Sequence, residues 1–450
     1  MTDEAKDKFL AWCDARGIFI SPKLDLFSPF TFEELTSSRS MKQYMEPEEN
    51  KLPIGSYVTP PSIAENVEKG TIQSHLKSHK PPLSNFSSMS VYLMHEFATE
   101  SSALSPYIEI LPQEYSNSLY LSDDQKEGLK GTTLGSMIEQ DFFERQFTKS
   151  ILPIVESYKN WPTNGDENLI ERFRRAAGTV MSRGFHDGEG RGPFILPVVD
   201  MFNHSCVFPN ISLKEDNGVF IVVAREFIGR DTEKVFNSYG ELSNTQLMHT
   251  YGFVEEDNPH DSVDIPIDCM VEQYRESGEE SEDKSCSASA KIEVLRDAKL
   301  ISERGFQISK EDMLPSSLIT TAQVLLMDDE AFEEYRKDPI ELGEDMIGEE
   351  GADDYLVAVY SLVLSTIEAR MTSYGVSFRD TYLQLKDPKL EEAQRSICVL
   401  RFSEQTMLLN LKSQLKEEID EIVGETQPKP VGNKRKTNEG EKKKQKKQRR

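Results

Sequence analysis

Cysteine is scarce in this 450-residue chain, and no two of its cysteines lie close together in sequence. Cysteines separated by two residues mark structural zinc sites, and dense cysteine patterns mark secreted domains held by disulfides. The chain has neither pattern, so we expect no metal site and no disulfide framework, and a reducing compartment fits best. The five cysteines are Cys13, Cys206, Cys269, Cys286 and Cys398.

Long apolar runs and an apolar leader are also missing. The longest apolar stretches, such as residues 194–199 and 219–224, fall far short of the roughly 20 residues that span a membrane. The first four residues, Met1-Thr2-Asp3-Glu4, are acidic, which argues against a secretory signal. We therefore expect a globular protein with at least one large core and no membrane partner.

Positive charge is in short supply except at the C-terminal end. Residues 429–450 hold eleven Lys or Arg and two Glu, a local charge of +9. Subtracting this from the net charge of −26 leaves −35 on the other 428 residues. An acidic body attracts basic partners and repels nucleic acid. We therefore expect a basic protein partner, with nucleic acid bound only weakly and through the tail.

The basic tail contains two dense clusters, Lys434-Arg435-Lys436 and residues 442–450. Such clusters are typical of nuclear localisation signals, and a solvated tail without a targeting role is the alternative. Because residues 425–450 have almost no apolar side chains, we expect them to be disordered. The sequence thus predicts a nuclear protein, and a cytoplasmic pool is also compatible with it.

Apolar spacing divides the chain into a helical N-terminal part, a centre of short strands and a helical C-terminal part. The helical period is clearest at 168–183, where Gly184 stops it. Asp216-Asn217-Gly218 between two apolar runs predicts a tight hairpin. Further expectations are helices at 5–16, from 89, at 133–158 with a bend at Pro153, at 322–327, 355–367 and 400–415, extended segments at 41–45, 54–59, 194–199 and 234–238, and an exposed loop at 272–287.

Polar residues end two apolar segments in the centre of the chain. Residues 199–205 read Val-Asp-Met-Phe-Asn-His-Ser, and residues 236–240 read Phe-Asn-Ser-Tyr-Gly. A Tyr-Gly-Phe sequence follows at 251–253, twelve residues after Tyr239. Buried or half-buried polar groups at strand ends need partners. Two such ends that lie close together would form a small site.

In this order the motifs resemble those of the SET-domain protein lysine methyltransferases. The resemblance is to the Rubisco large-subunit methyltransferase-like class, closest to its ribosomal-protein and RelA branch, and it runs from about Phe9 to Leu415. It implies an α+β fold, in which residues 1–255 form a SET domain of small curved β-sheets split by a helical insert at about 85–180. An all-α substrate-binding domain at 256–424 and the disordered tail at 425–450 would follow.

The resemblance implies transfer of a methyl group from S-adenosylmethionine to a lysine of a basic nuclear or ribosomal protein, a histone or a transcription factor. A lysine amine has a reference pKa of about 10.4, so it arrives mostly protonated. Only the neutral amine attacks a methyl group, and an apolar aromatic channel beside a sulfonium cation favours loss of the proton. Positioning and charge placement should then supply much of the rate of this in-line displacement.

Tyr239 is the catalytic residue that the resemblance implies, and it would also contact the substrate lysine. It precedes Gly240, which permits close approach of the backbone. A core tyrosine whose hydroxyl binds a nearby carbonyl is the alternative. Tyr251 would be the second aromatic residue of the site, packed on the donor or on the lysine channel, with ordinary packing at a helix end as its alternative.

Asn203 and His204 match the pair that binds the donor, and the alternative for them is a satisfied turn at a strand end. Arg183 would contact donor and substrate, and Asp200 the substrate. For these two the alternatives are a cation at a helix C-terminus and a structural hydrogen-bond acceptor. Phe86 aligns with an aromatic residue of the donor pocket. We expect no metal role for His204, because no other histidine lies at ligand spacing to it.

One segment departs from the family pattern. Relatives usually begin the SET domain with a Gly-x-Gly strand, whereas this chain has Ser38-Arg39-Ser40-Met41 there. Ser40 and Met41 are the donor-contacting positions of that alignment, but serine permits fewer backbone conformations than glycine. Two alternatives therefore stay open: a non-catalytic SET-fold module that only binds proteins, and a protein-histidine methyltransferase.

Overall fold

The structure is a computed structural model. It describes residues 2–20, 26–27, 49–52, 57–65, 67–139, 141–162, 168–187, 189–216, 218–225, 235–278, 280–281, 283–342 and 352–426. Ser40, Met41, the expected extended segment at 41–45 and the basic tail lie outside these residues. Across the described helices, no stretch combines the length and the apolar character that crossing a membrane requires.

The chain forms two compact units that alternate along the sequence. The first holds Met1–Cys269, Ile301–Pro315 and Ile367–Leu411, and the second holds Met270–Leu300, Ser316–Thr366 and Lys412–Arg450. The predicted boundary between residues 255 and 256 lies inside the first unit, and as a domain boundary it stays a prediction. Each unit is described by itself below.

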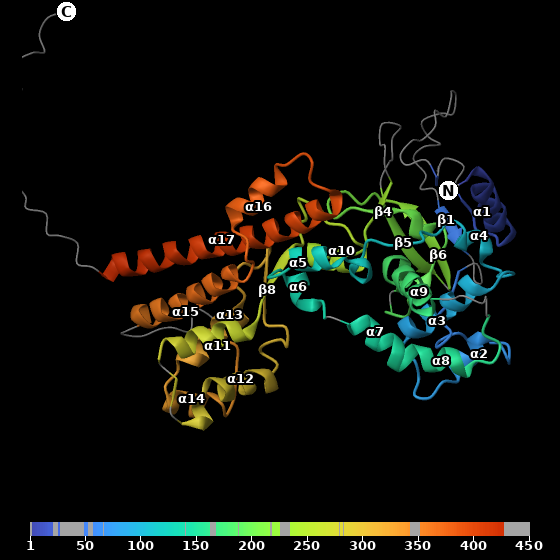
Figure 1. The fold of residues 1–450 in the computed structure, drawn as a ribbon. Coiled ribbons are helices and arrows are strands. Elements are labelled where there is room, and N and C mark those ends of the chain that lie inside the picture. The colour runs from blue at the N-terminus through green and yellow to red at the C-terminus, as the bar shows by residue number, and fades with distance from the viewer. Residues whose placement is uncertain are drawn as a thin grey trace, which may run out of the picture. The chain divides into compact units, whose positions relative to one another are not determined.

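Amphipathic helices form the helical side of the first unit, namely α1 (Asp3–Ala15), α3 (Asn85–Ala98) and α9 (Leu169–Arg183) (Figure 1). The first two begin after Thr2 and Ser84, whose side-chain oxygens accept backbone N–H groups of the first turn. α3 packs against α9, and their buried faces join one hydrophobic core. The helices expected at 5–16, from 89 and at 168–183 are therefore confirmed.

The predicted hairpin is present in the first unit. β5 (Ile211–Asp216) and β6 (Val219–Ala224) pair antiparallel, and Gly218 in the turn has a φ of +79°. β1 (Glu49–Leu52) pairs with the other edge of β6, which gives the strand order β1-β6-β5. Of the extended segment expected at 54–59, Val58 forms an isolated bridge to Ile195.

The predicted strand at 194–199 is wrong beyond its first two residues. β3 is only Phe194–Ile195, and it pairs antiparallel with β2 (Gly184–Phe185). Pro197 has no N–H for a ladder, and Val198 has a φ of +78°, so the chain turns into a short 3₁₀ helix at Val199–Met201. The polar ends then form a two-stranded parallel ladder of β4 (Asn203–His204) and β7 (Phe236–Asn237).

The single long helix expected at 133–158 is also wrong. The segment contains α6 (Thr133–Met137), α7 (Phe142–Gln146), a π-helical stretch at Phe147–Ile151 and α8 (Leu152–Ser157). Extended backbone at Ile138 ends α6, and Asp141 has a φ of +57° just before α7. Pro153 sits in the first turn of α8, where its missing N–H costs no helical hydrogen bond.

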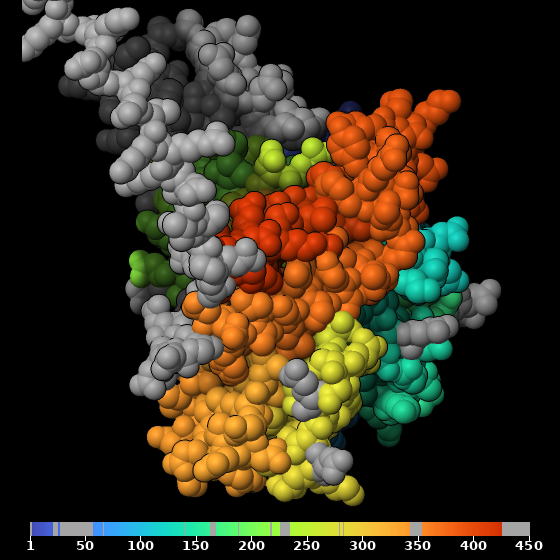
Figure 2. Space-filling model, turned by 90° about the vertical axis from the view of Figure 1, so that its left-hand side faces the viewer, coloured from blue at the N-terminus to red at the C-terminus, as the bar shows by residue number. Residues whose placement is uncertain are grey.

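Short elements complete the first unit. β8 (Ser262–Ile265) pairs antiparallel with β9 (Phe306–Ser309). Figure 2 shows the orange segment around α16 at the molecular surface, and this helix exposes Tyr382 and Leu383. The short helices are α2 (Ile72–Lys77), α4 (Ser105–Ile108), η2 (Ser118–Tyr120), α5 (Asp123–Gly128), α10 (Asn244–Thr250) and α16 (Phe378–Leu385).

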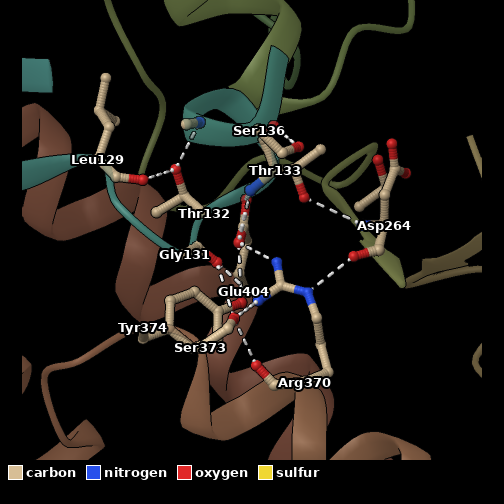
Figure 3. A network of polar contacts seen from close by, with 12 residues as sticks. Leu129, Gly131, Thr132, Thr133, Ser136, Asp264, Arg370, Ser373, Tyr374 and Glu404 are labelled. Carbon is tan, nitrogen blue, oxygen red and sulfur yellow. Dashed lines mark hydrogen bonds and ion pairs between the residues drawn. The ribbon is translucent and has the colours of Figure 1, made fainter. Parts of the chain in front are cut away.

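A buried ionic network joins distant segments of the first unit (Figure 3). Both carboxylate oxygens of Glu404 accept the N–H of Thr133, at 3.0 and 3.2 Å. Tyr374 and Arg370 donate to Glu404 Oε2 at 2.8 and 3.3 Å, and Arg370 also donates to the carbonyls of Gly131 and Asp264. Because the Glu404 side chain is fully buried, these donors replace the water that the carboxylate has lost.

The second unit is helical. It contains most of α11 (Ile267–Glu276), then η5 (Lys284–Cys286), α12 (Ala288–Asp297), α13 (Ser316–Leu326) and α14 (Asp329–Tyr335), and α15 (Ala352–Thr372) and α17 (Glu392–Thr426) contribute to both units. Helices expected at 322–327, 355–367 and 400–415 are confirmed. The loop expected at 272–287 is wrong at 272–276, which continue α11, and Cys286 is buried.

Candidate active site

A cavity of about 470 Å³ lies in the first unit, where the C-terminal end of α9 meets the small strands. This volume is within the range of about 300–1,000 Å³ that is usual for ligand pockets. Six separate segments of the sequence form its wall. The lining residues are Ser182, Arg183, Gly184, Phe185, His186, Asp200, Ser212, Leu213, Arg225, Asn237, Ser238, Tyr239, Gly240 and Tyr251.

The parallel ladder of β4 and β7 brings the two polar strand ends together. Asn203 pairs with Phe236, and His204 pairs with Asn237. His204 is buried and Asn203 is exposed, and neither is among the residues that line the cavity. Both lie in the strand that pairs with the segment of Asn237, and they do not line the cavity themselves.

Tyr239 is held on three sides. Its hydroxyl donates to the carbonyl of Phe202 at 2.6 Å, and its backbone N–H donates to His204 Nδ1 at 2.9 Å. Its ring stacks on His204 with centroids 4.9 Å apart and lies 4.6 Å from the Tyr251 ring. Burial and the neighbouring Tyr251 raise the pKa of Tyr239, so the phenol keeps its proton at neutral pH.

Tyr251 is positioned by the tight end of α10. The next residue, Gly252, has a φ of +85°, and a Cβ there would lie 2.3 Å from the backbone carbon of Ser116. Only glycine fits such a close approach in this conformation. Burial raises the pKa of Tyr251 to about 12, so the cavity has a second neutral phenol beside Tyr239.

Arg183, which is partly exposed, forms an ion pair with the buried Asp200 at the cavity wall. Arg183 Nη1 donates to Asp200 Oδ2 at 3.2 Å and to the Asp200 carbonyl at 2.9 Å. Burial raises the pKa of Asp200, although Arg183 and a hydrogen bond from Tyr107 lower it. Among the described residues, Arg183 Nε and Asp200 Oδ1 are buried and have no hydrogen-bond partner. The pair therefore leaves one donor and one acceptor unsatisfied.

Sequence reasoning missed two residues that support the site. Tyr107 is fully buried and donates to Asp200 Oδ2, and no local pattern marks it because its partner is 93 positions away. Asn244 binds both Asp261 and Glu255 and so fixes the start of α10. Asn244 directly follows Ser243, the N-cap of a capping box with Gln246, and this Ser-x-x-Gln pattern could have located the helix start.

Phe86 was predicted as a site residue, but it does not lie at the cavity. It lies in the first turn of α3, is 37% exposed and does not line the cavity. Ser40 and Met41 lie outside the residues that the structure describes. The structure thus brings together Tyr239, Tyr251, Arg183 and Asp200 at the cavity, and His204 contacts Tyr239 from the neighbouring strand.

His204, Cys206 and Glu255 place possible ligand atoms within 4.8 Å of one another. His204 Nδ1 accepts the N–H of Tyr239, so the proton of the neutral ring is on Nε2, which faces Cys206 Sγ at 3.0 Å. A protonated nitrogen cannot coordinate a metal. Burial and Glu255 raise the pKa of the Cys206 thiol to about 12, so the thiol keeps its proton when no metal is bound. These hydrogen bonds disfavour a metal at the cluster.

Comparison with known sequences matches both halves of the chain. A family described as Rubisco LSMT substrate-binding matches residues 284–408. N-lysine methyltransferase SETD6 of Rattus norvegicus is 27% identical over 354 residues, which cover 73% of this chain and 71% of the relative. N-lysine methyltransferase setd6 of Salmo salar is 24% identical over 441 residues, which cover 90% and 95% of the two chains.

Solved structures show the fold. The SET domain of LSMT bound to lysine and AdoHcy aligns with a TM-score of 0.67 at 16% identity, over 93% of this chain and 92% of that one. Rubisco LSMT bound to AdoMet aligns with a TM-score of 0.65 at 17% identity, over 93% of each chain. The fold is therefore the LSMT-like SET fold with a helical substrate-binding domain, and the predicted α+β class is confirmed.

Proposed function

We propose that the chain is a SET-domain lysine methyltransferase of the Rubisco LSMT-like family, that it methylates a lysine of a basic nuclear protein, and that Tyr239 is the catalytic residue; the similarity to N-lysine methyltransferases and to LSMT structures supports this proposal. The reaction class and the donor, S-adenosylmethionine, are those of the family. Within the family we place the chain in the ribosomal-protein and RelA branch. The twelve-residue interval between Tyr239 and Tyr251 supports that placement.

The unsatisfied atoms of the ion pair at the cavity wall fit this donor. S-adenosylmethionine ends in an amino acid with one carboxylate and one ammonium group. Arg183 Nε could donate to a carboxylate and Asp200 Oδ1 could accept from an ammonium group. Both atoms are buried and without a partner among the described residues, so a shift of the two side chains would have to open them to the donor. Arg183 would therefore hold the donor, while Asp200 would hold the ammonium group of either donor or substrate. This match is the observation that carries the proposal.

The two tyrosines suit the reacting amine. When bound, the donor supplies an activated methyl group on a sulfonium. Because the hydroxyl of Tyr239 donates its proton to the Phe202 carbonyl, its oxygen is free to accept a hydrogen bond from the lysine amine. That bond would direct the amine lone pair towards the methyl group. The neutral rings of Tyr239 and Tyr251, 4.6 Å apart, would favour the uncharged amine over the ammonium form.

We assign supporting roles to the remaining predicted residues. Asn203 and His204 are proposed as donor contacts, through side chain and backbone, on the resemblance, and His204 also fixes the Tyr239 backbone. Phe86, Ser40 and Met41 are proposed as donor contacts on the resemblance alone. Substrate proteins would be attracted by the charge of −35 on residues 1–428, and the basic tail would direct the protein to the nucleus.

One observation favours a second candidate, a non-catalytic module that only binds proteins. The aligned start of the SET domain has Ser38 and Ser40 where relatives usually have glycine. Calorimetric titration with S-adenosylmethionine separates the two candidates, because a module without the donor site would give no binding heat and no thermal stabilisation.

Labelled donor and nuclear extract test the proposal itself. We expect the wild-type protein to label at least one extract protein, and mass spectrometry should place the methyl group on lysine. Modified histidine would instead support the protein-histidine methyltransferase alternative. If the donor binds but no protein is labelled, the proposed activity is wrong.

A further inference from the structure

Arg225 carries the unpaired charge of the cavity. It follows β6 directly, and its backbone N–H donates to the Asn210 carbonyl at 2.8 Å, which fixes its place at the cavity wall. The other arginine of the wall, Arg183, is neutralised by Asp200. Within the described residues, no hydrogen bond or ion pair holds the guanidinium group of Arg225, which is exposed. Among the described residues, Arg225 is therefore an exposed cation of the cavity wall without a side-chain partner.

This cation lies within reach of a bound substrate. A cavity of about 470 Å³ would measure roughly 10 Å across if it were spherical. An extended chain covers about 3.3–3.6 Å per residue. A peptide whose lysine enters the cavity beside Asp200 and Tyr239 therefore passes Arg225 within roughly three residues of that lysine.

The net charge of the protein cannot discriminate between different lysines of one substrate protein, whereas Arg225 can. A charge of −35 on residues 1–428 attracts any basic protein, and such a protein offers many lysines. A guanidinium group at the cavity rim would attract a carboxylate and repel another cation, which discriminates between lysines of one protein. The acidic residues 1–428 would thus attract basic proteins, whereas Arg225 would favour acidic residues close to the target lysine.

We propose that Arg225 is a specificity-determining residue, which selects target lysines that have an Asp or Glu within about three residues. The proposal rests on the lysine methyltransferase activity proposed above and concerns the same cavity. The matched control is Lys214, an exposed cation on β5 of the same hairpin that does not line the cavity.

The experiment maps methylated lysines. The full chain and its Arg225→Gln, Arg225→Glu and Lys214→Gln variants are incubated with deuterated-methyl donor and phosphatase-treated nuclear extract from cells that lack the protein. Mass spectrometry then locates each labelled lysine. We expect Asp or Glu near wild-type sites about 3- to 5-fold more often than near all lysines of the extract, the range of an exposed ion pair. Arg225→Gln should remove this enrichment and Arg225→Glu should shift it to Lys and Arg, while Lys214→Gln keeps it.

Other outcomes overturn the proposal. Wild-type sites without acidic enrichment, or an enrichment that Arg225→Gln leaves intact, would show that Arg225 does not select the substrate. Calorimetry with S-adenosylmethionine adds a second readout, and a tenfold weaker donor affinity of Arg225→Gln would assign the residue to the donor carboxylate instead. Failure of the underlying activity is distinguishable, because the wild-type protein would then label nothing.

Discussion

The hydroxyl of Tyr107 donates to Asp200 Oδ2 over 2.5 Å, although the two residues are 93 positions apart in the chain. Tyr107 and the Asp200 side chain are both fully buried. Arg183 Nη1 approaches the same oxygen at 3.2 Å, so the carboxylate is fixed from two sides and its other oxygen stays without a partner. Tyr107 thereby orients the acceptor that we assign to an ammonium group, without contacting the cavity itself.

Replacing Tyr107 by Phe should weaken the binding of S-adenosylmethionine about tenfold and lower the free energy of unfolding by about 1–2 kcal/mol. The variant keeps the ring in the core and removes only the hydrogen bond to the buried carboxylate. Calorimetry and urea denaturation measure the two effects. Tyr57→Phe is the control, because the Tyr57 hydroxyl donates to the Gly218 carbonyl away from the cavity. Normal donor affinity in Tyr107→Phe would remove the positioning role.

Replacing Tyr239 by Phe should cut turnover by roughly 100-fold while leaving donor affinity near normal, because the variant loses the oxygen that we place beside the amine. Steady-state methyl transfer and donor titration measure the two quantities. Tyr335→Phe is a matched control in the second unit, since the Tyr335 hydroxyl also donates to a backbone carbonyl, that of Ile340. Unchanged turnover in Tyr239→Phe would show that the phenol takes no part in the reaction.

Local sequence patterns predicted the elements whose stability is local. Asp216-Asn217-Gly218 located the turn between β5 and β6, and the period of residues 168–183 located α9, because turn chemistry and helical spacing act within a few residues. The same reasoning failed at 133–158. Apolar residues recur there at helical spacing, but the backbone at Ile138 is extended and Asp141 has positive φ, so the segment becomes several short helices.

The candidate site was predictable where motifs mark it and not where tertiary contacts complete it. The ordered motifs around Asp200, Tyr239 and Tyr251 named residues that do meet at one cavity. Tyr107 could not be found, because a single tyrosine in an apolar segment carries no sign of a partner 93 residues away. Which atoms of Arg183 and Asp200 stay unsatisfied also depends on the packing of the folded chain.

Replacing Gly252 by Ala should lower the free energy of unfolding by more than about 2 kcal/mol and reduce turnover, since the added Cβ would lie 2.3 Å from the backbone of Ser116 and displace Tyr251. Gly375→Ala is the control, because Gly375 also has positive φ, +66°, but has open space at its Cβ. That control should cost only the backbone strain of about 1 kcal/mol. If urea denaturation gave the same loss of unfolding free energy for Gly252→Ala and Gly375→Ala, the contact between position 252 and Ser116 would not be tight.

The buried network around Glu404 predicts a pH dependence of stability. Burial raises the pKa of the Glu404 carboxyl from 4.5 to about 7. Arg370, Tyr374 and Thr133 lower this pKa, but the effect of burial is larger. Between these two pH values the unfolded chain releases a proton that the folded chain keeps, so stability falls as pH rises. The stabilisation that Glu404 contributes is fully present below pH 4.5 and has been lost above about pH 7. At about 1.4 kcal/mol for each pKa unit, the loss is about 3 kcal/mol at most.

Replacing Glu404 by Gln should remove this slope, because the amide has nearly the same shape and does not titrate in this range. Urea denaturation of both proteins at intervals from pH 4.5 to 7.5 measures it as the difference between two curves. The difference cancels the other shifted groups, including His204, whose pKa burial lowers and whose contribution to stability therefore rises with pH. Parallel curves would mean that Glu404 is already ionised at pH 4.5, with Arg370 and Tyr374 holding its charge more strongly than burial opposes it.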